Sequence, residues 1–165
     1  MNTINNIKSN YMKHLLFGLL LLFCVSAKGI EVTHGPWICD MDSTGATIVW
    51  VTDKPGLSWV EIAPEGKDHF YGKVRPRYYD VLAGRKLLTD SVHRVRVTGL
   101  KPDSRYRYRV FTQQVDEWRY DDWVSLGKTA LTDVWKGKPY EFTTYPVKPR
   151  EITFLVLNDI HERLQ

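Results

Sequence analysis

Short segments in which apolar and polar residues alternate constrain this chain more than any other sequence feature. The clearest is residues 46–52 (ATIVWVT), which is rich in β-branched residues and contains Trp50. Residues 91–97 (SVHRVRV) and 105–110 (RYRYRV) repeat the alternation. Successive side chains of a strand point to opposite faces, so each segment predicts a strand with one buried face. We expect Trp50 to be the core tryptophan of a sandwich.

Turn signals and shorter apolar segments complete an all-β pattern. Residues 33–41 contain Pro36, which cannot donate to a central sheet, so this segment predicts an irregular edge strand. Further strands are predicted at residues 58–63 (SWVEIA) and 140–144 (YEFTT), and turns at residues 42–45 and 53–56. The pattern predicts a β-sandwich of about seven strands.

Composition fits one packed domain. Hydrophobic residues make up 43% of the chain and aromatic residues 13%, which is ample for a core and excludes a disordered tail. The chain has 23 basic and 19 acidic residues, and two of the basic ones, Lys8 and Lys13, lie in a segment that we expect to be removed. The remaining excess, 21 against 19, predicts no affinity for nucleic acid.

Residues 1–27 have the features of a secretory signal. Basic residues precede the apolar run at residues 15–25, and small residues then predict cleavage before Lys28, with the apolar part helical and outside the folded body. We therefore expect a secreted or periplasmic protein with no membrane contact after cleavage. A retained anchor helix is one alternative. A lipoprotein using Cys24 is another, which Phe23 disfavours because a small residue is expected there.

The end of the sequence carries a candidate metal motif. Residues 152–157 (ITFLVL) form an apolar run that suits a strand buried on both faces. Asp159 and His161 follow two residues apart, so their side chains are expected to point the same way. A carboxylate and an imidazole make a natural pair of metal ligands. The alternative is a solvated loop in which the Asp-x-His spacing is accidental.

Two stretches resemble known families. The segment FLVLNDIHE is similar to the first motif of calcineurin-like metallophosphoesterases, and the sequence upstream resembles the β-sandwich that precedes the catalytic domain in purple acid phosphatases. Residues 98–110 also resemble the corner of fibronectin type III domains, in which the hydroxyl of Tyr106 would bond to upstream backbone. Purple acid phosphatases of this kind have Gly where His161 stands. His161 therefore favours the general Asp-x-His type over the iron-tyrosinate type.

The resemblance implies a division of the chain and a function for its parent. By this resemblance the chain would divide into a signal peptide (1–27), a fibronectin type III-like sandwich (28–145), a linker (146–150) and the truncated start of an α/β metallophosphoesterase domain (151–165). The parent would hydrolyse phosphate mono- or diesters with two divalent or trivalent transition-metal ions (Fe, Mn or Zn), and Asp159 and His161 would ligate the first ion. The sandwich would have the protein's own C-terminal catalytic domain as its partner.

This fragment itself is expected to be inactive. The resemblance places the remaining metal motifs beyond Gln165, so we expect no catalytic residue and no tight metal binding here. Two other classes remain open, namely a carbohydrate- or surface-binding sandwich without catalysis and a structural adhesion module. The first draws on an aromatic-rich insertion at residues 115–138, which contains Trp118, Tyr120, Trp123 and Trp135. We expect that insertion to pack against a neighbouring domain.

Three further expectations concern a histidine, a cysteine and a row of arginines in the sandwich. Strand parity puts His93 on the apolar face, where a core or rim histidine is expected rather than a ligand. Cys39 follows apolar neighbours and predicts a buried thiol. The outward row of Arg105, Arg107 and Arg109 predicts a solvated strand face rather than a phosphate site.

Overall fold

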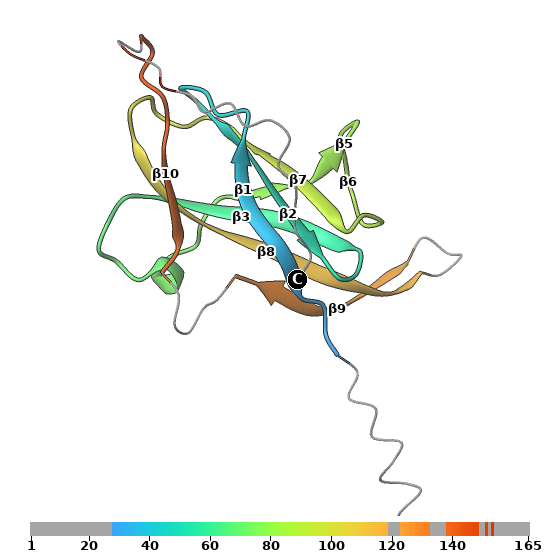
Figure 1. Ribbon diagram of the computed structural model, residues 1–165. Coiled ribbons are helices and arrows are strands. Elements are labelled where there is room, and N and C mark those ends of the chain that lie inside the picture. Colours follow the sequence, from blue (N-terminus) through green and yellow to red (C-terminus); the bar gives the residue numbers. More distant parts are fainter. Residues whose placement is uncertain (1–27, 119–122, 133–137, 149–150, 152, 154–165) are drawn as a thin grey trace, which may run out of the picture.

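The computed structural model describes residues 28–118, 123–132, 138–148, 151 and 153 (Figure 1). The expected signal helix lies outside these residues. Within the described part no helix is long and apolar enough to cross a membrane. The elements are β1 (Val32–Cys39), β2 (Ala46–Thr52), β3 (Gly56–Pro64), the 3-10 turn η1 (Phe70–Gly72), β4 (Arg77–Tyr79), β5 (Val81–Leu82), β6 (Arg85–Lys86), β7 (Val92–Val97), β8 (Arg105–Trp118), β9 (Val124–Leu131) and β10 (Tyr140–Thr143).

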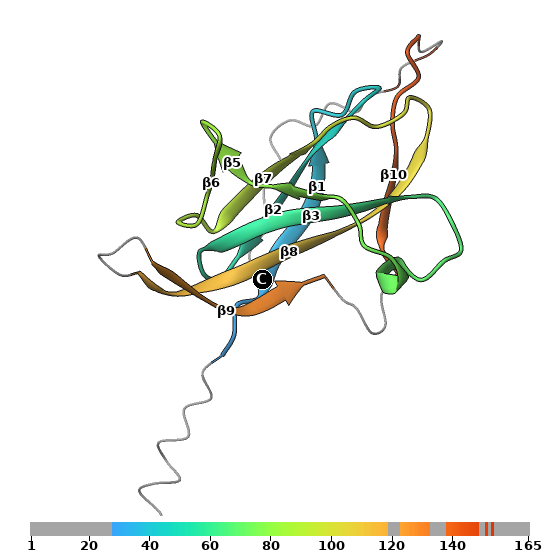
Figure 2. The same cartoon turned by 180° about the vertical axis from the view of Figure 1, so that it is seen from behind.

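Two antiparallel sheets form the body of the molecule (Figures 1 and 2). The smaller has the order β1-β2-β7, and the larger has the order β10-β8-β3-β4 with β9 also paired to β8. Strands β5 and β6 form a separate hairpin. The all-β sandwich expected from the sequence is confirmed. The strands beyond the expected set are β4, β5 and β6, which have only two or three residues each, and β9, which lies in the segment that the sequence marked only as an insertion.

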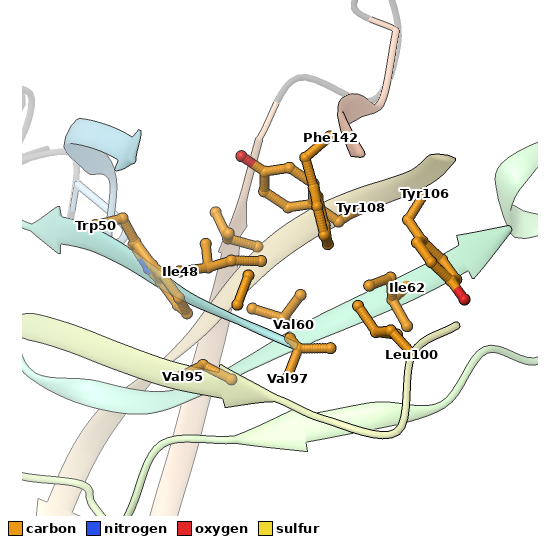
Figure 3. Packing of buried hydrophobic residues seen from close by; sticks show 12 residues of the cluster. Ile48, Trp50, Val60, Ile62, Val95, Val97, Leu100, Tyr106, Tyr108 and Phe142 are labelled. Carbon is orange, nitrogen blue, oxygen red and sulfur yellow. The ribbon is translucent and has the colours of Figure 1, made fainter. Parts of the chain in front are cut away.

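The core lies between the two sheets and follows the predicted alternation (Figure 3). Every second residue of β2 and of β7 is buried. These side chains meet others from β3, β8 and β10 of the opposite sheet. The cluster consists of Ala46, Ile48, Trp50, Val60, Ile62, Val95, Val97, Leu100, Tyr106, Tyr108, Val110 and Phe142. Contact between inward faces of both sheets gives this part of the chain its own hydrophobic core.

Trp50 belongs to this core and has no exposed surface. Its indole Nε1 donates to Thr112 Oγ1 at 2.9 Å, and Ser58 Oγ lies 2.8 Å from the same Thr112 oxygen. A buried indole N–H needs a partner, and Thr112 supplies one from the opposite sheet. Trp50 therefore joins the two sheets by packing and by a hydrogen bond.

His93 is a core histidine, as the alternation of residues 91–97 predicted. It is 1% exposed, its ring centroid lies 5.2 Å from that of Trp50, and its Nε2 lies 2.8 Å from Thr52 Oγ1. Burial lowers the pKa of His93 to about 4, because the charged imidazolium is poorly solvated between the sheets. The folded protein therefore holds His93 neutral at pH values where an unfolded chain would bind a proton.

The first prediction is a pH dependence of stability that comes from His93. Between the ordinary pKa near 6.5 and the folded pKa near 4, only the unfolded state takes up the proton. The stability present above pH 6.5 is therefore lost as pH falls, by about 2 kcal/mol between about pH 7 and 4.5. Urea denaturation at both pH values should show this loss, and His93→Gln should show a smaller one. Equal losses in the two proteins would assign the effect to other groups.

The edge strand β1 corrects one expectation. Its pairing with β2 is irregular around Pro36, as predicted, with register shifts on both sides of His34. Cys39 is exposed and Trp37 is 50% exposed, so the predicted buried thiol is wrong. Both residues pair with the outward-facing residues of β2, and cross-strand partners share a face of the sheet. Trp37 and Cys39 therefore lie on the outside of the sandwich, while Ile38 between them packs against the core.

Candidate functional site

The predicted metal ligands Asp159 and His161 lie outside the described residues. Within the described ranges, no group of three or more His, Cys, Asp or Glu side chains is placed to hold a metal ion. What the structure does describe is the end of the sandwich from which the chain leads to these residues. It also describes the two surface features that the sequence singled out, the arginine row and the aromatic insertion.

The chain leaves the sandwich through a network of backbone hydrogen bonds. Tyr145 N donates to Asp42 O at 3.2 Å, and Asp103 N donates to Tyr145 O at 3.2 Å. Thr144, which is 1% exposed, donates through Oγ1 to Lys101 O at 2.6 Å. These bonds tie the segment after β10 to the turns at residues 40–45 and 98–104. The chain is therefore held at one end of the sandwich up to Tyr145, and Val147 beyond it is 72% exposed.

Tyr106 closes the turn beside this exit. Its hydroxyl accepts a hydrogen bond from Lys101 N at 2.9 Å, while its ring packs on Phe142 with centroids 6.0 Å apart. Leu100 lies beneath the turn and is 7% exposed. A tyrosine hydroxyl bonded to backbone a few residues upstream is the geometry of a tyrosine corner. The corner fixes the turn to which the exit segment is hydrogen-bonded.

The second prediction tests this corner. Tyr106→Phe should lower the free energy of unfolding by about 1–3 kcal/mol, because it removes the acceptor of a part-buried backbone N–H and keeps the ring. Urea denaturation measures the effect. Tyr140→Phe is the matched control, since Tyr140 lies on the neighbouring strand and is 42% exposed. An unchanged midpoint for Tyr106→Phe would show that the hydroxyl does not stabilise the turn.

The arginine row of β8 is not a solvated face, contrary to the sequence-based expectation. Arg105 is exposed, but Arg107 is 6% and Arg109 4% exposed. The covering segment is residues 65–75, which includes η1 and lies against the outer side of β8. Arg107 donates to Pro64 O at 3.1 Å, to Asp68 O at 2.8 Å and to Asp68 Oδ1 at 2.7 Å. The alternation along β8 correctly placed these arginines on the outer face of the sheet. It could not show that another segment covers this face.

Ion pairs and aromatic rings complete this layer. Arg75 donates to Asp68 Oδ2 at 2.7 Å, so hydrogen bonds from Arg75 and Arg107 hold the pKa of Asp68 well below its usual range. The Arg109 guanidinium carbon lies 5.8 Å from the ring centroid of Phe70 and 5.3 Å from that of Tyr71. Its Nη1 donates to Thr132 O at 2.9 Å. The guanidinium groups of this layer thus bind protein atoms and fix the covering segment.

The described part of the aromatic insertion is mostly regular strand. β8 continues to Trp118, and β9 pairs back along it from Val124 to Leu131. Trp118 is 56% and Trp123 51% exposed. Tyr120 and Trp135 lie outside the described residues. Packing of these aromatic residues against a neighbouring domain remains a prediction.

The two antiparallel sheets and the corner at Tyr106 place the described chain among fibronectin-like β-sandwich domains. Comparison with protein families then gives the particular family. Residues 37–144 match the family described as Purple acid Phosphatase, N-terminal domain. The match covers more than half of the chain and both sheets, so the chain belongs to this family. A search of curated proteins finds no match.

Membership of this family implies a phosphatase as the parent protein, and that family of enzymes implies a binuclear metal centre. The match ends at residue 144, before Asp159 and His161. The sandwich is therefore assigned by the family, while the two proposed ligands depend on the sequence motif.

Proposed function

We propose that this chain is the amino-terminal part of an exported, metal-dependent phosphoesterase. The family match over residues 37–144 is the observation that carries the proposal. The apolar run followed by the Asp159-x-His161 spacing supports it, because this motif comes just after the sandwich in the order that such an enzyme needs. Residues 1–27 supply the export signal.

The sandwich acts as an accessory domain that holds the start of the catalytic domain. Backbone hydrogen bonds of Tyr145 with Asp42 and Asp103 fix the chain as far as Tyr145, and the sequence of the connection that follows, with its two prolines, predicts a stiff linker. Asp159 and His161 offer a carboxylate oxygen and an imidazole nitrogen, which fit Fe, Mn or Zn. Two such ions, when bound, would polarise the phosphate ester and activate water. Further ligands would come from beyond Gln165.

The third prediction tests the proposed enzyme. Residues 28–165 with Mn²⁺, Zn²⁺ or Fe²⁺ should not hydrolyse an aryl phosphate, because two protein ligands cannot enclose a catalytic metal site, which needs about three or more. A chain extended beyond Gln165 should turn over the same substrate. Asp159→Ala in that extended chain should reduce turnover by at least about a hundredfold, because it removes a metal ligand.

A matched carboxylate gives the control. Glu65→Ala in the extended chain removes an exposed sandwich carboxylate and should leave turnover unchanged. Turnover by residues 28–165 that disappears in Asp159→Ala would overturn the expected inactivity of the fragment. Full activity of the extended Asp159→Ala chain would overturn the assignment of Asp159 as a ligand.

A further inference from the structure

The outer face of the smaller sheet carries a group of apolar side chains. Cross-strand partners share a face, so the pairing of β1, β2 and β7 defines this surface, which we call the Trp37 face. Its rows, from the β1–β2 turn onward, are Cys39, Thr47 and Arg96, then Trp37, Val49 and Arg94, then His34, Val51 and Val92. Trp37 is 50% and Val92 42% exposed, and Cys39 is exposed. The solvent face of an antiparallel sheet is normally polar, so this apolar group indicates a contact surface.

Trp37 is held in place on this face by the glycine two residues before it. Gly35 has a φ of +86°, and a Cβ there would lie 3.1 Å from Trp37 Cε3 and 3.0 Å from Val49 O. The indole therefore packs directly on the backbone of Gly35, where a side chain would displace it. A large aromatic ring in a fixed position is the usual anchor of a protein interface.

The outer face of the larger sheet is already occupied. Residues 65–75 lie over Arg107, which bonds to Asp68 O at 2.8 Å. At the end of that sheet next to the chain exit, Arg105 pairs with Glu141. Within the described chain no segment lies over the Trp37 face, since every outward residue of β7 on it is exposed. The Trp37 face is therefore the sheet surface that a following domain can cover.

The chain leaves the sandwich beside this face. Tyr145 N bonds to Asp42 O in the β1–β2 turn at 3.2 Å. Both views show the segment after β10 at the end of the molecule toward which β1 runs (Figures 1 and 2). The linker at residues 146–150 spans at most about 17 Å, and Trp37, five residues before Asp42, lies within the same distance of the turn. A domain that begins at residue 151 therefore starts within reach of the Trp37 face.

We propose that the Trp37 face is the surface on which the domain beginning at residue 151 docks. The proposal rests on the proposed function, which requires such a domain, and it adds the surface that receives it. A short linker keeps the domain at a high effective concentration, so a modest apolar contact favours the docked state. The proposal departs from the expectation that the aromatic insertion makes this contact. Trp118 ends the 14-residue strand β8, about 45 Å from the end that pairs with β10.

Cys39 reports on this contact, because it lies on the Trp37 face and is the single cysteine of residues 28–165. The rate at which a maleimide alkylates Cys39 is measured by peptide mass spectrometry in residues 28–165 and in the chain extended beyond Gln165. The fragment contains both sheets and the described core, so it folds with this thiol exposed. Alkylation should be at least about tenfold slower in the extended chain, because a docked state favoured tenfold exposes the thiol for about a tenth of the time.

Variants locate the contact through the protection of Cys39, defined as the alkylation rate in the fragment divided by that in the extended chain. Trp37→Ser should reduce the protection to about twofold or less, because truncating an anchor tryptophan weakens an interface by more than about tenfold. Making each variant in both chains cancels any direct effect of the substitution on the thiol. Trp118→Ser is the matched control, since Trp118 is 56% exposed on the other sheet, and it should keep the wild-type protection.

Four results would overturn the proposal. The first is equal alkylation of the wild-type fragment and extended chain, and the second is protection that survives Trp37→Ser. Loss of protection in Trp118→Ser would place the contact on the aromatic insertion instead. Alkylation of the fragment that slows as its concentration rises would show that a second copy of the sandwich covers this face.

Failure of this test is distinguishable from failure of the proposed function, because alkylation requires neither metal nor turnover. Protection of Cys39 without aryl phosphate hydrolysis would leave the docking surface intact and overturn the proposed enzyme. Hydrolysis that is lost in Asp159→Ala, without protection of Cys39, would do the reverse.

Discussion

Trp50→Ala should lower the free energy of unfolding by about 3–5 kcal/mol, the largest stability effect that we expect from one substitution in this protein. Trp50 has no exposed surface and contacts residues of both sheets (Figure 3). Its removal leaves a cavity between sheets that are held by their own backbone pairing, so the surrounding side chains can only partly fill the space. The substitution also removes the Nε1 donor to Thr112.

Urea denaturation of residues 28–165 followed by far-ultraviolet circular dichroism measures this effect without relying on tryptophan fluorescence. Trp37→Ala is the matched control, because Trp37 is a tryptophan of the same sheet with 50% of its surface exposed. Its substitution should cost less than about 1 kcal/mol. Similar losses for both tryptophans would contradict the position of Trp50 in the shared core.

Arg107→Ala should lower the free energy of unfolding by about 3 kcal/mol. Arg107 makes two hydrogen bonds to Asp68 of the covering segment, one of them to the charged carboxylate, and a third to Pro64 O at the end of β3. Removing the guanidinium leaves two backbone carbonyls and a carboxylate without these donors in a part-buried layer. Arg75 still pairs with Asp68 at 2.7 Å in this variant. The loss of unfolding free energy should therefore lie at the lower end of the range for a broken buried ion pair.

Arg105 provides the control on the same strand. Its side chain is 51% exposed and pairs with Glu65 and Glu141 at the surface, so Arg105→Ala should cost about 0.2–1 kcal/mol. Arg107→Lys keeps the charge but cannot reproduce the planar set of donors, and it should fall between the two alanine variants. Equal midpoints for the Arg105 and Arg107 variants would support the solvated row predicted from the sequence.

Residues 46–52 and 91–97 show how much of the core the sequence predicted. Their alternation placed Trp50 and His93 on the inward face, and both are buried in the structure. The hydroxyl contact of Tyr106 was also expected, because the corner lies within a few residues of sequence. Local patterns sufficed in these cases, since the period of a strand fixes which face each side chain takes.

The errors arose where a distant segment decides burial. Cys39 is exposed because its partner on β2 faces outward, and Arg107 is buried because residues 65–75 cover it. The extent of the aromatic insertion was predicted, but its pairing as β9 along β8 was not. Strand parity gives a side chain's face but not what covers that face.

The sequence by itself therefore determined the β-sandwich, its inward faces and the corner at Tyr106, because these depend on strand period and on contacts within one turn. It also supplied the Asp159-x-His161 motif, which lies outside the described residues and the family match. Only the tertiary structure decided that Arg107 is an internal ion-pair residue and that Cys39 is exposed. These facts depend on pairing between segments far apart in the chain, where no local period carries the information.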